Sequence, residues 1–255
     1  MTALRVTQRN LWVYRRTWRG SVFGSFLTPL LYLGALGVGL GSFIAAQDTS
    51  ALGGVTYLQF LGPGLLAATC MQTATFEATF PIMGKISWRR NYEAMLAAPL
   101  SVRDLVLGEM GWMTVRLTTI SIAFLVVLTL FGIPTSPLAL LGAPAAILTG
   151  LCFFCAIMAF TATQKNDSGF AALFRFVINP LFLFSGTFFP VDRLPDALHV
   201  VAALTPLYHG VALIRGLVLQ TPELANWPIH LGYLLVFGSV AAYLAYRLLF
   251  RRLVK

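Results

Sequence analysis

The stretch "FLFSGTFFPVDRLPDALHVVAALTPLYHG", from Phe182 to Gly210, decides how the whole chain folds. It begins with the composition of a lipid-soluble helix, breaks at Pro190, and resumes as two short apolar pieces led by Pro195 and Pro206. Proline is favourable in the first turn of a helix, so each piece is expected to start one. Neither piece can cross about 30 Å of hydrocarbon at about 1.5 Å per residue. The pattern therefore predicts a segment that re-enters the membrane while it is buried against protein.

The composition points to a membrane protein. Hydrophobic residues make up 58% of the 255 residues and charged residues 11%, and the mean hydropathy is +0.79, which excludes an ordinary water-soluble domain. The 18 Lys and Arg against 9 Asp and Glu give a net charge of +9. In a membrane chain such an excess indicates cytoplasmic loops, and no nucleic-acid partner is expected.

A window of about 19 residues finds six apolar spans. The first is too long for a cleavable signal peptide and lacks a small-residue cleavage site, so it is kept as a membrane helix. The sequence thus predicts an all-α integral membrane fold and a single transmembrane domain over residues 1–255. The spans lie near Ser21–Ala45, Tyr57–Met83, Gly111–Ile133, Gly142–Thr163, Phe170–Phe189 and Pro228–Leu249.

The Lys and Arg residues set the expected orientation. In a six-span arrangement nearly all of them fall on one side, and the other side has only Arg193 and Arg215. By the positive-inside rule both termini are cytoplasmic, and a bacterial cytoplasmic (inner) membrane fits best. The residues on the basic side are Arg5, Arg9, Arg15, Arg16, Arg19, Lys85, Arg89, Arg90, Arg103, Lys165, Arg247, Arg251, Arg252 and Lys255.

Residues 1–20 are expected to form an amphipathic interfacial helix. Leu4, Leu11 and Trp18 recur every seven residues, and a basic stripe runs beside them. Such a helix lies flat on the inner leaflet, where it either anchors the topology or also braces a cytoplasmic partner. The basic stripe consists of Arg5, Arg9, Arg16 and Arg19.

Residues 84–109 form the only cytoplasmic connection of any length in this arrangement. Its "WRRNYEAMLAAPL" portion predicts a short helix over about Trp88–Ala97, ended by Pro99, and Ser101 is the expected N-cap of the next helix. The composition suits docking into a groove of a soluble protein, against the alternative of a solvated loop that only carries charge. The expected contact residues are Trp88, Arg89, Arg90, Tyr92, Glu93, Met95 and Leu96.

Residues 190–225 form the expected outer re-entrant segment. From the residues alone, its apolar part is expected to re-enter the outer leaflet, where it can also serve as a plain packing device at the outer rim. Its candidate residues are Pro190, Asp192, Arg193, Pro195, Pro206 and His209, with Asp196 and His199 expected beside Asp192 and Arg193.

Glu77 is an ionisable residue inside a predicted span, where charge is costly and often functional. It is about two turns from the cytoplasmic end of that span. It can form a structural ion pair with Arg116 or Arg175, take part in gating or substrate passage, or simply be exposed at the interface.

Familiar chemical motifs give no catalytic site. Gly84-Lys85 lacks the rest of a phosphate-binding loop, so any nucleotide must bind another subunit. "GALGVGLG", from Gly34 to Gly41, is better explained as a helix-packing face, and Cys152 and Cys155 as buried inert thiols. No metal ligand set, cofactor site or catalytic triad stands out, so the chain itself is not expected to be an enzyme.

Three stretches resemble the permease subunits of type-2 ATP-binding-cassette exporters: "FEATFPIMGKISWRRNYEAMLAAPLS" (Phe76–Ser101), "NPLFLFSGTFFPVDRLPDAL" (Asn179–Leu198) and "TPLYHGVALIRGL" (Thr205–Leu217). Within that family the chain is most similar to NodJ-like permeases of lipo-oligosaccharide export, followed by daunorubicin-type drug-resistance permeases. The resemblance implies two separate ATPase subunits that hold ATP and Mg, and a second permease, either an identical copy or a paralogue. It also implies that Trp88–Ala97 is the coupling helix, that the N-terminal helix contacts the ATPase, and that the paired outer helices close the exit.

The resemblance implies outward, ATP-driven movement of an amphipathic substrate such as a lipid-linked saccharide, a lipid or a hydrophobic drug. A passive channel or assembly scaffold without an ATPase is the main alternative. A membrane-embedded enzyme would need converging polar groups in the spans, and Glu77 has no evident partner of that kind.

Overall fold

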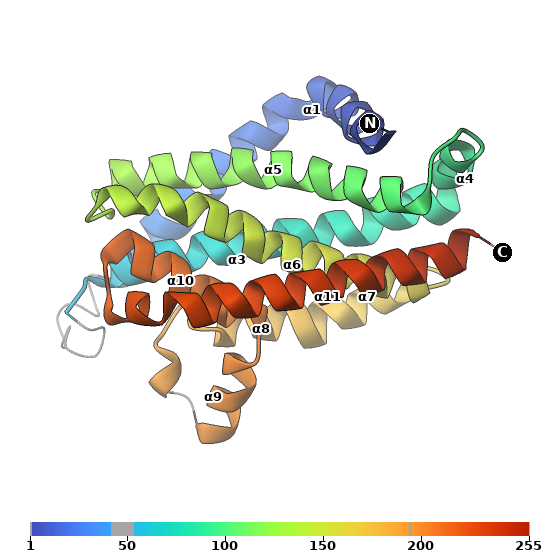
Figure 1. Cartoon of the computed structure of the whole chain (residues 1–255). Helices are drawn as coiled ribbons and strands as arrows, with labels where there is room; N and C mark the ends of the chain where they lie inside the picture. The colour runs from blue at the N-terminus through green and yellow to red at the C-terminus, as the bar shows by residue number, and fades with distance from the viewer. Residues whose placement is uncertain (1, 42–53, 194, 255) are drawn as a thin grey trace.

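The structure is a computed structural model of the whole chain and describes residues 2–41, 54–193 and 195–254. These residues form helices and connecting turns, with no β-strand among them (Figure 1). The fold class is all-α, as the composition and apolar spans predict.

The α-helices and short helical turns follow one another along the chain. A π-helical turn (η1, η3 and η5) follows α1, α3 and α7, and a 3-10 turn (η4, η6 and η7) precedes α6, α9 and α11. In order they are α1 (Thr2–Tyr32), η1 (Leu33–Leu40), α3 (Tyr57–Met83), η3 (Gly84–Trp88), α4 (Asn91–Leu96), α5 (Val102–Leu130), η4 (Pro137–Leu141), α6 (Gly142–Thr163), α7 (Ser168–Leu173), η5 (Phe174–Ile178), α8 (Asn179–Phe184), η6 (Val191–Arg193), α9 (Asp196–Ala203), α10 (Pro206–Leu219), η7 (Pro222–Asn226) and α11 (Trp227–Leu253).

Helix α6 is the centre of the bundle. It packs against α3, α5, α10 and α11, while α1 packs along α5. In the most apolar part of α6, 72% of the residues are buried, against 22% in α11. An outward face as apolar as that of α11 is expected where a helix meets lipid and not water.

Several spans have the bounds that hydropathy predicts. Helices α3 and α6 begin and end at the predicted residues, and α5 and α11 contain most or all of the third and sixth spans. Within residues 2–41, 54–193 and 195–254, three helical stretches are long and apolar enough to cross a membrane: Val102–Leu130, Pro137–Thr163 and Pro222–Leu253. Shorter apolar helices cover Pro29–Gly39, Ser168–Phe184 and Pro206–Leu219.

The first and fifth predicted spans differ from the structure. Helix α1 runs from Thr2 to Tyr32 without a break near residue 20, so the N-terminal segment continues directly into the first span. The end of that span, at residues 42–45, lies outside the described residues. The fifth span ends early, at Phe184, because Gly186 has a positive φ of 82° and turns the chain.

The chain ends share one end of the bundle with α4, and the turn between α5 and η4 lies at the opposite end (Figure 1). Lys85, Arg89, Arg90 and Arg252 belong to the same end as α4 because they lie on or beside η3, α4 and the end of α11. This end is called the basic end below, and the other is called the far end.

Candidate functional site

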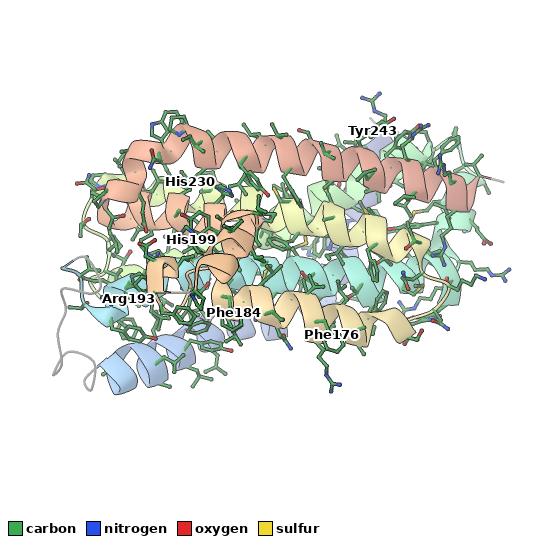
Figure 2. The ribbon with its side chains drawn as sticks, turned by 90° about the horizontal axis from the view of Figure 1, so that it is seen from below. Phe176, Phe184, Arg193, His199, His230 and Tyr243 are labelled. Carbon is green, nitrogen blue, oxygen red and sulfur yellow. The ribbon has the colours of Figure 1, made fainter. Side chains whose placement is uncertain are left out.

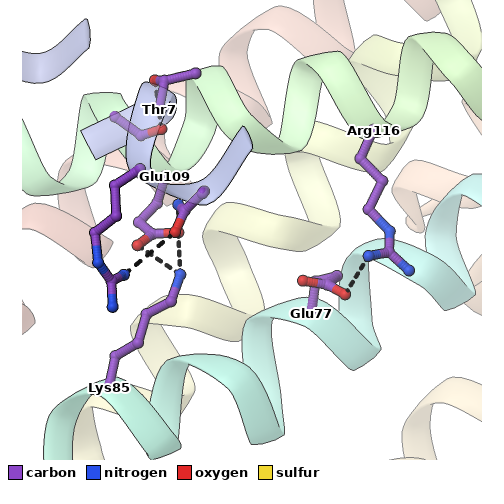
Figure 3. A network of polar contacts seen from close by, with 8 residues as sticks. Thr7, Glu77, Lys85, Glu109 and Arg116 are labelled. Carbon is purple, nitrogen blue, oxygen red and sulfur yellow. Dashed lines mark hydrogen bonds and ion pairs between the residues drawn. The ribbon is translucent and has the colours of Figure 1, made fainter. Parts of the chain in front are cut away.

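Glu109 joins three segments at the basic end (Figure 3). Its side chain, in the second turn of α5, is almost fully buried, at 1% exposure. Both carboxylate oxygens lie 2.7 Å from Nζ of Lys85 on η3, and one accepts a 3.0 Å hydrogen bond from Nδ2 of Asn10 on α1. The Thr7 hydroxyl donates to the Gly108 carbonyl at 2.9 Å. Glu109 therefore fastens α1 and η3 to α5.

Helix α4 is shorter than the predicted Trp88–Ala97. Trp88 ends the turn η3, and Arg90 adopts a left-handed conformation with φ 48°, so the α-helix starts only at Asn91. Ser101 does cap α5 as predicted: its hydroxyl accepts a hydrogen bond from the Asp104 amide at 3.2 Å.

Tyr92 does not face outward, contrary to its predicted role in docking. Its side chain is 1% exposed and packs in the core, because a helix of only six residues needs a buried side chain to hold it in place. Burial, and next the charge of the Glu109 carboxylate, raise the pKa of the Tyr92 phenol well above its usual value. Met95 is half-buried against the same core, which leaves Trp88, Arg89, Arg90 and Glu93 as the exposed residues of the predicted set.

Arg252, near the end of α11, makes a second connection to η3. Its Nη1 donates to the carbonyl oxygens of Thr161, Ala162 and Gln164 at the end of α6, and its Nη2 donates to the Ser87 hydroxyl at 3.0 Å. A cation at a helix C-terminus satisfies carbonyls that lack helical partners. Arg252 thereby links α6 and α11 to the segment that leads into α4.

Glu77 pairs with Arg116, one of the two partners that the sequence offered. Their side chains approach to 2.9 Å and are 13% and 25% exposed (Figure 3). Arg175 is exposed, on the turn η5. The Glu77–Arg116 pair lies on the wall of a pocket of about 330 Å³ between α1, α3, η3 and α5.

The N-terminal half of α1 packs on α5 through a face other than the apolar face that is predicted to lie on the leaflet. Leu4 and Leu11 are 68% and 41% exposed, whereas Val6 and Asn10 are buried against α5. Of the basic stripe, Arg5 and Arg16 are exposed and Arg9 lines the pocket. The side chains of Trp18 and Arg19 lie outside the described residues.

At the far end, Arg215 on α10 is buried at 5% exposure and holds three segments together. Its Nη2 donates to the carbonyls of Gly186 at 2.7 Å and Phe60 at 3.3 Å, and its guanidinium lies 3.8 Å from the centre of the Phe60 ring. Its Nη1 lies 3.5 Å from the Glu223 carboxylate on η7.

The predicted re-entrant segment folds into short proline-led helices. Pro195 is the N-cap residue of α9, and Pro206 is the first residue of α10, with Pro190 just before η6. Asp192 lies 3.6 Å from His199, and Arg193 and His199 are seen at the end away from the C-terminus (Figure 2). The Asp196 side chain lies outside the described residues.

His209 is buried and faces His230 of α11, with their Nδ1 atoms 2.8 Å apart. The His209 ring stacks on Tyr233 with ring centres 3.9 Å apart. This contact joins α10 to α11, so His209 packs the far end inside the protein and does not lie at an open interface.

Sequence reasoning missed Glu109, Asn10 and Arg252 as connectors. The signal for Glu109 was an acidic residue at the start of an apolar helix in a chain with only 9 Asp and Glu. Nothing local marks Asn10 or Arg252, because their partners are distant in the sequence.

The helices, their apolar outer faces and the separate basic end define a polytopic, all-helical integral membrane protein. The family model of the ABC-2 type transporter matches residues 3–219. Over 99% of its length this chain is 36% identical to Nodulation protein J of Rhizobium leguminosarum bv. viciae, covering 95% of that protein. It is 32% identical to Nodulation protein J of Rhizobium meliloti (strain 1021), over 98% and 94% of the two chains. It is 23% identical to the inner membrane transport permease YadH of Escherichia coli (strain K12), over 82% of each.

The chain therefore belongs to the ABC-2 type transporter family and is a transport permease of that family. The resemblance seen in the three stretches of sequence is confirmed.

Proposed function

We propose that this chain is the membrane-spanning half of an ATP-driven exporter that moves an amphipathic substrate outward across the cytoplasmic membrane. ATP and Mg bind two separate ATPase subunits, and a second permease, identical or paralogous, completes the membrane domain. The chain itself performs no catalysis. The substrate class comprises lipid-linked saccharides, lipids and hydrophobic drugs, and drug export of this kind confers antibiotic resistance.

One observation carries the proposal: a short exposed helix is rigidly attached to the main helices. Helix α4 presents Glu93, and the two residues before it, Arg89 and Arg90, are also exposed, while Glu109 and Arg252 fasten the preceding turn η3 to α1, α5, α6 and α11. A push on α4 from an ATPase would therefore reach most of the bundle. A solvated loop would need none of these buried connections.

The topology in the proposal is six spans with both termini in the cytoplasm. The chain ends and α4 share one end of the bundle (Figure 1), and that end carries most of the Lys and Arg. By the positive-inside rule this end is cytoplasmic. The far end is then outside, where Arg215 and the pair His209–His230 hold α10 in place as the outer closure.

The test is to purify the tagged chain in mild detergent and assay whatever ATPase accompanies it. We expect a stoichiometric ATP-binding-cassette subunit whose hydrolysis is coupled to transport. Arg90→Ala and Glu93→Ala, which remove exposed side chains of the α4 region, are expected to uncouple hydrolysis from transport while the chain stays inserted.

Lys165→Ala is the matched control, because Lys165 is an exposed cation in a different connection. It should leave coupling unchanged. A homo-oligomer without any nucleotide-binding subunit would overturn the proposal and favour a passive channel or an assembly scaffold.

A further inference from the structure

The pocket at the basic end lies across the boundary at which two spans are predicted to leave the membrane. The predicted spans end at Met83 in α3 and start at Gly111 in α5. Glu77 and Arg116 line the pocket on the membrane side of this boundary, and Lys85 and Arg89 line it on the other side. Its lining residues therefore extend from the predicted hydrocarbon depth to the headgroup layer.

The pocket has more positive charge than its own carboxylates neutralise. Of its four cations, Lys85 is paired with Glu109 at 2.7 Å and Arg116 with Glu77 at 2.9 Å. Arg9 makes only a 3.5 Å hydrogen bond to the Asn10 amide oxygen, and within the described residues neither Arg9 nor Arg89 forms a salt bridge. Two guanidinium groups on α1 and beside η3 are thus free to bind one anion.

The remaining walls are aromatic. Trp88 is 57% exposed and Trp112 is buried with its ring against Tyr14, at 5.2 Å between ring centres. Trp and Tyr are typical of the membrane interface, where an apolar ring meets a polar layer. A volume of about 330 Å³ is at the small end of ligand pockets, which suits a headgroup and not a whole lipid.

We propose that this pocket binds the phosphate headgroup of an anionic amphiphile of the membrane, with Arg9 and Arg89 as the phosphate ligands. Basic pockets between membrane helices are known to hold such headgroups. A soluble phosphate would offer the same anion but would leave the apolar walls and the membrane-side half of the pocket unfilled. This inference needs the membrane setting of the chain and does not rest on ATPase coupling.

The bound headgroup would also lie next to the buried network around Glu109 and the turn η3. Arg9 is next to Asn10, which binds Glu109, and Arg89 directly follows Trp88 of η3. A bound headgroup would therefore bridge α1 and the segment leading to α4.

The experiment is a titration of the purified chain in neutral detergent with phosphatidylglycerol that carries brominated acyl chains, followed by quenching of tryptophan fluorescence. We expect saturable quenching that is largely lost in Trp88→Phe and Trp112→Phe. Arg9→Gln and Arg89→Gln should each weaken binding by about five- to tenfold, the effect of losing one charge-assisted contact. Arg89→Lys, which keeps the charge but loses the planar fork, should weaken binding less.

Arg5→Gln and Arg16→Gln are the matched controls, since each removes one exposed arginine from the same helix outside the pocket. They should change the affinity by less than about twofold, because they weaken only the general attraction between the anionic micelle and the protein. The variants Arg9→Gln and Arg89→Gln lose the same general attraction and, in addition, a contact in the pocket. Equal losses in pocket and control variants would overturn the proposal.

Two further outcomes also decide the matter. Brominated phosphatidylcholine that quenches with the same affinity would show that the negative charge is not recognised, which overturns the proposal. Glycerol 3-phosphate that competes as well as phosphatidylglycerol would identify a soluble phosphate as the ligand and reject the lipid. Because no ATPase is present in the assay, failure here leaves the exporter proposal standing.

Discussion

Replacing Glu109 by Gln tests whether the buried network holds the basic end together. The substitution keeps the shape of the side chain and its acceptor oxygen but removes the charge. Lys85, with 15% of its side chain exposed, would then face a neutral amide in a place that water reaches poorly. The hydrogen bond from Asn10 keeps an acceptor in the variant, so the charge pair is the main loss.

The magnitude follows from the distance between the charges. Two unit charges 2.7 Å apart attract by about 6 kcal/mol at an effective dielectric constant of about 20. The cost of removing both ions from water offsets much of this attraction, but that cost remains for Lys85 after the mutation. Removal of one partner from a buried pair typically destabilises by about 3–5 kcal/mol, and Glu109→Gln should lie near the lower limit because the amide still accepts hydrogen bonds.

The assay is the free energy of unfolding in detergent for the wild type, Glu109→Gln, Lys85→Gln and the double variant. The double variant has no unpaired charge, so it should be more stable than the sum of the single losses predicts, with a coupling energy of about 1–3 kcal/mol. Glu93→Gln is the control: Glu93 is exposed on α4, and its loss should cost less than about 0.5 kcal/mol.

A loss in Glu109→Gln no larger than that in Glu93→Gln would refute the reasoning. It would mean that water solvates the pair, so that neither charge is effectively buried. Additive single losses in the double variant would likewise show that Lys85 and Glu109 do not interact.

Three other substitutions test the connections elsewhere. Glu77→Arg should impair the protein, and Arg116→Glu in the same chain should restore at least part of its transport, since the 2.9 Å pair would be re-formed with reversed charges; continued inactivity of the double variant would count against the pair. Arg252→Ala should lower the free energy of unfolding by about 1–3 kcal/mol through loss of charged hydrogen bonds to α6, whereas the exposed neighbour variant Arg251→Ala should be neutral. Gly64→Ala should destabilise by about 1–3 kcal/mol in the same assay, because the added Cβ would lie 3.0 Å from the backbone of the neighbouring turn at Thr187; unchanged stability would show that this turn gives way.

The sequence predicts the long helices well because hydropathy over about 19 residues is a strong, local signal. Helices α3 and α6 have the predicted bounds, Pro206 is the first residue of α10 as expected, and Pro195 directly precedes α9. These features depend on residues close together in the chain. The fifth span is shorter than hydropathy suggests because Gly186 turns the chain while the sequence is still apolar.

The candidate site is less predictable because it depends on distant partners and on local backbone exceptions. Glu109 meets residues 24 and 99 positions away, and no periodicity reveals such pairs. The start of α4 depends on the positive φ of Arg90, which is uncommon for a residue other than glycine. The sequence predicts that Tyr92 contacts a partner because a tyrosine in a loop is usually accessible, but the structure buries its side chain in the core.

The distribution of paired and unpaired charge gives the two ends of the bundle different roles. At the far end, Arg215 donates hydrogen bonds to carbonyl oxygens and pairs with Glu223, so its charge holds α10 against the neighbouring segments. At the basic end, Glu77 and Glu109 neutralise one cation each and fasten their helices, but Arg9 and Arg89 remain at the pocket. Because the acidic residues there are used to fix the scaffold, the excess positive charge is held on rigid elements. Because the helices that carry Arg9 and Arg89 are fixed in this way, a bound headgroup has to order only the two side chains and not the backbone that carries them.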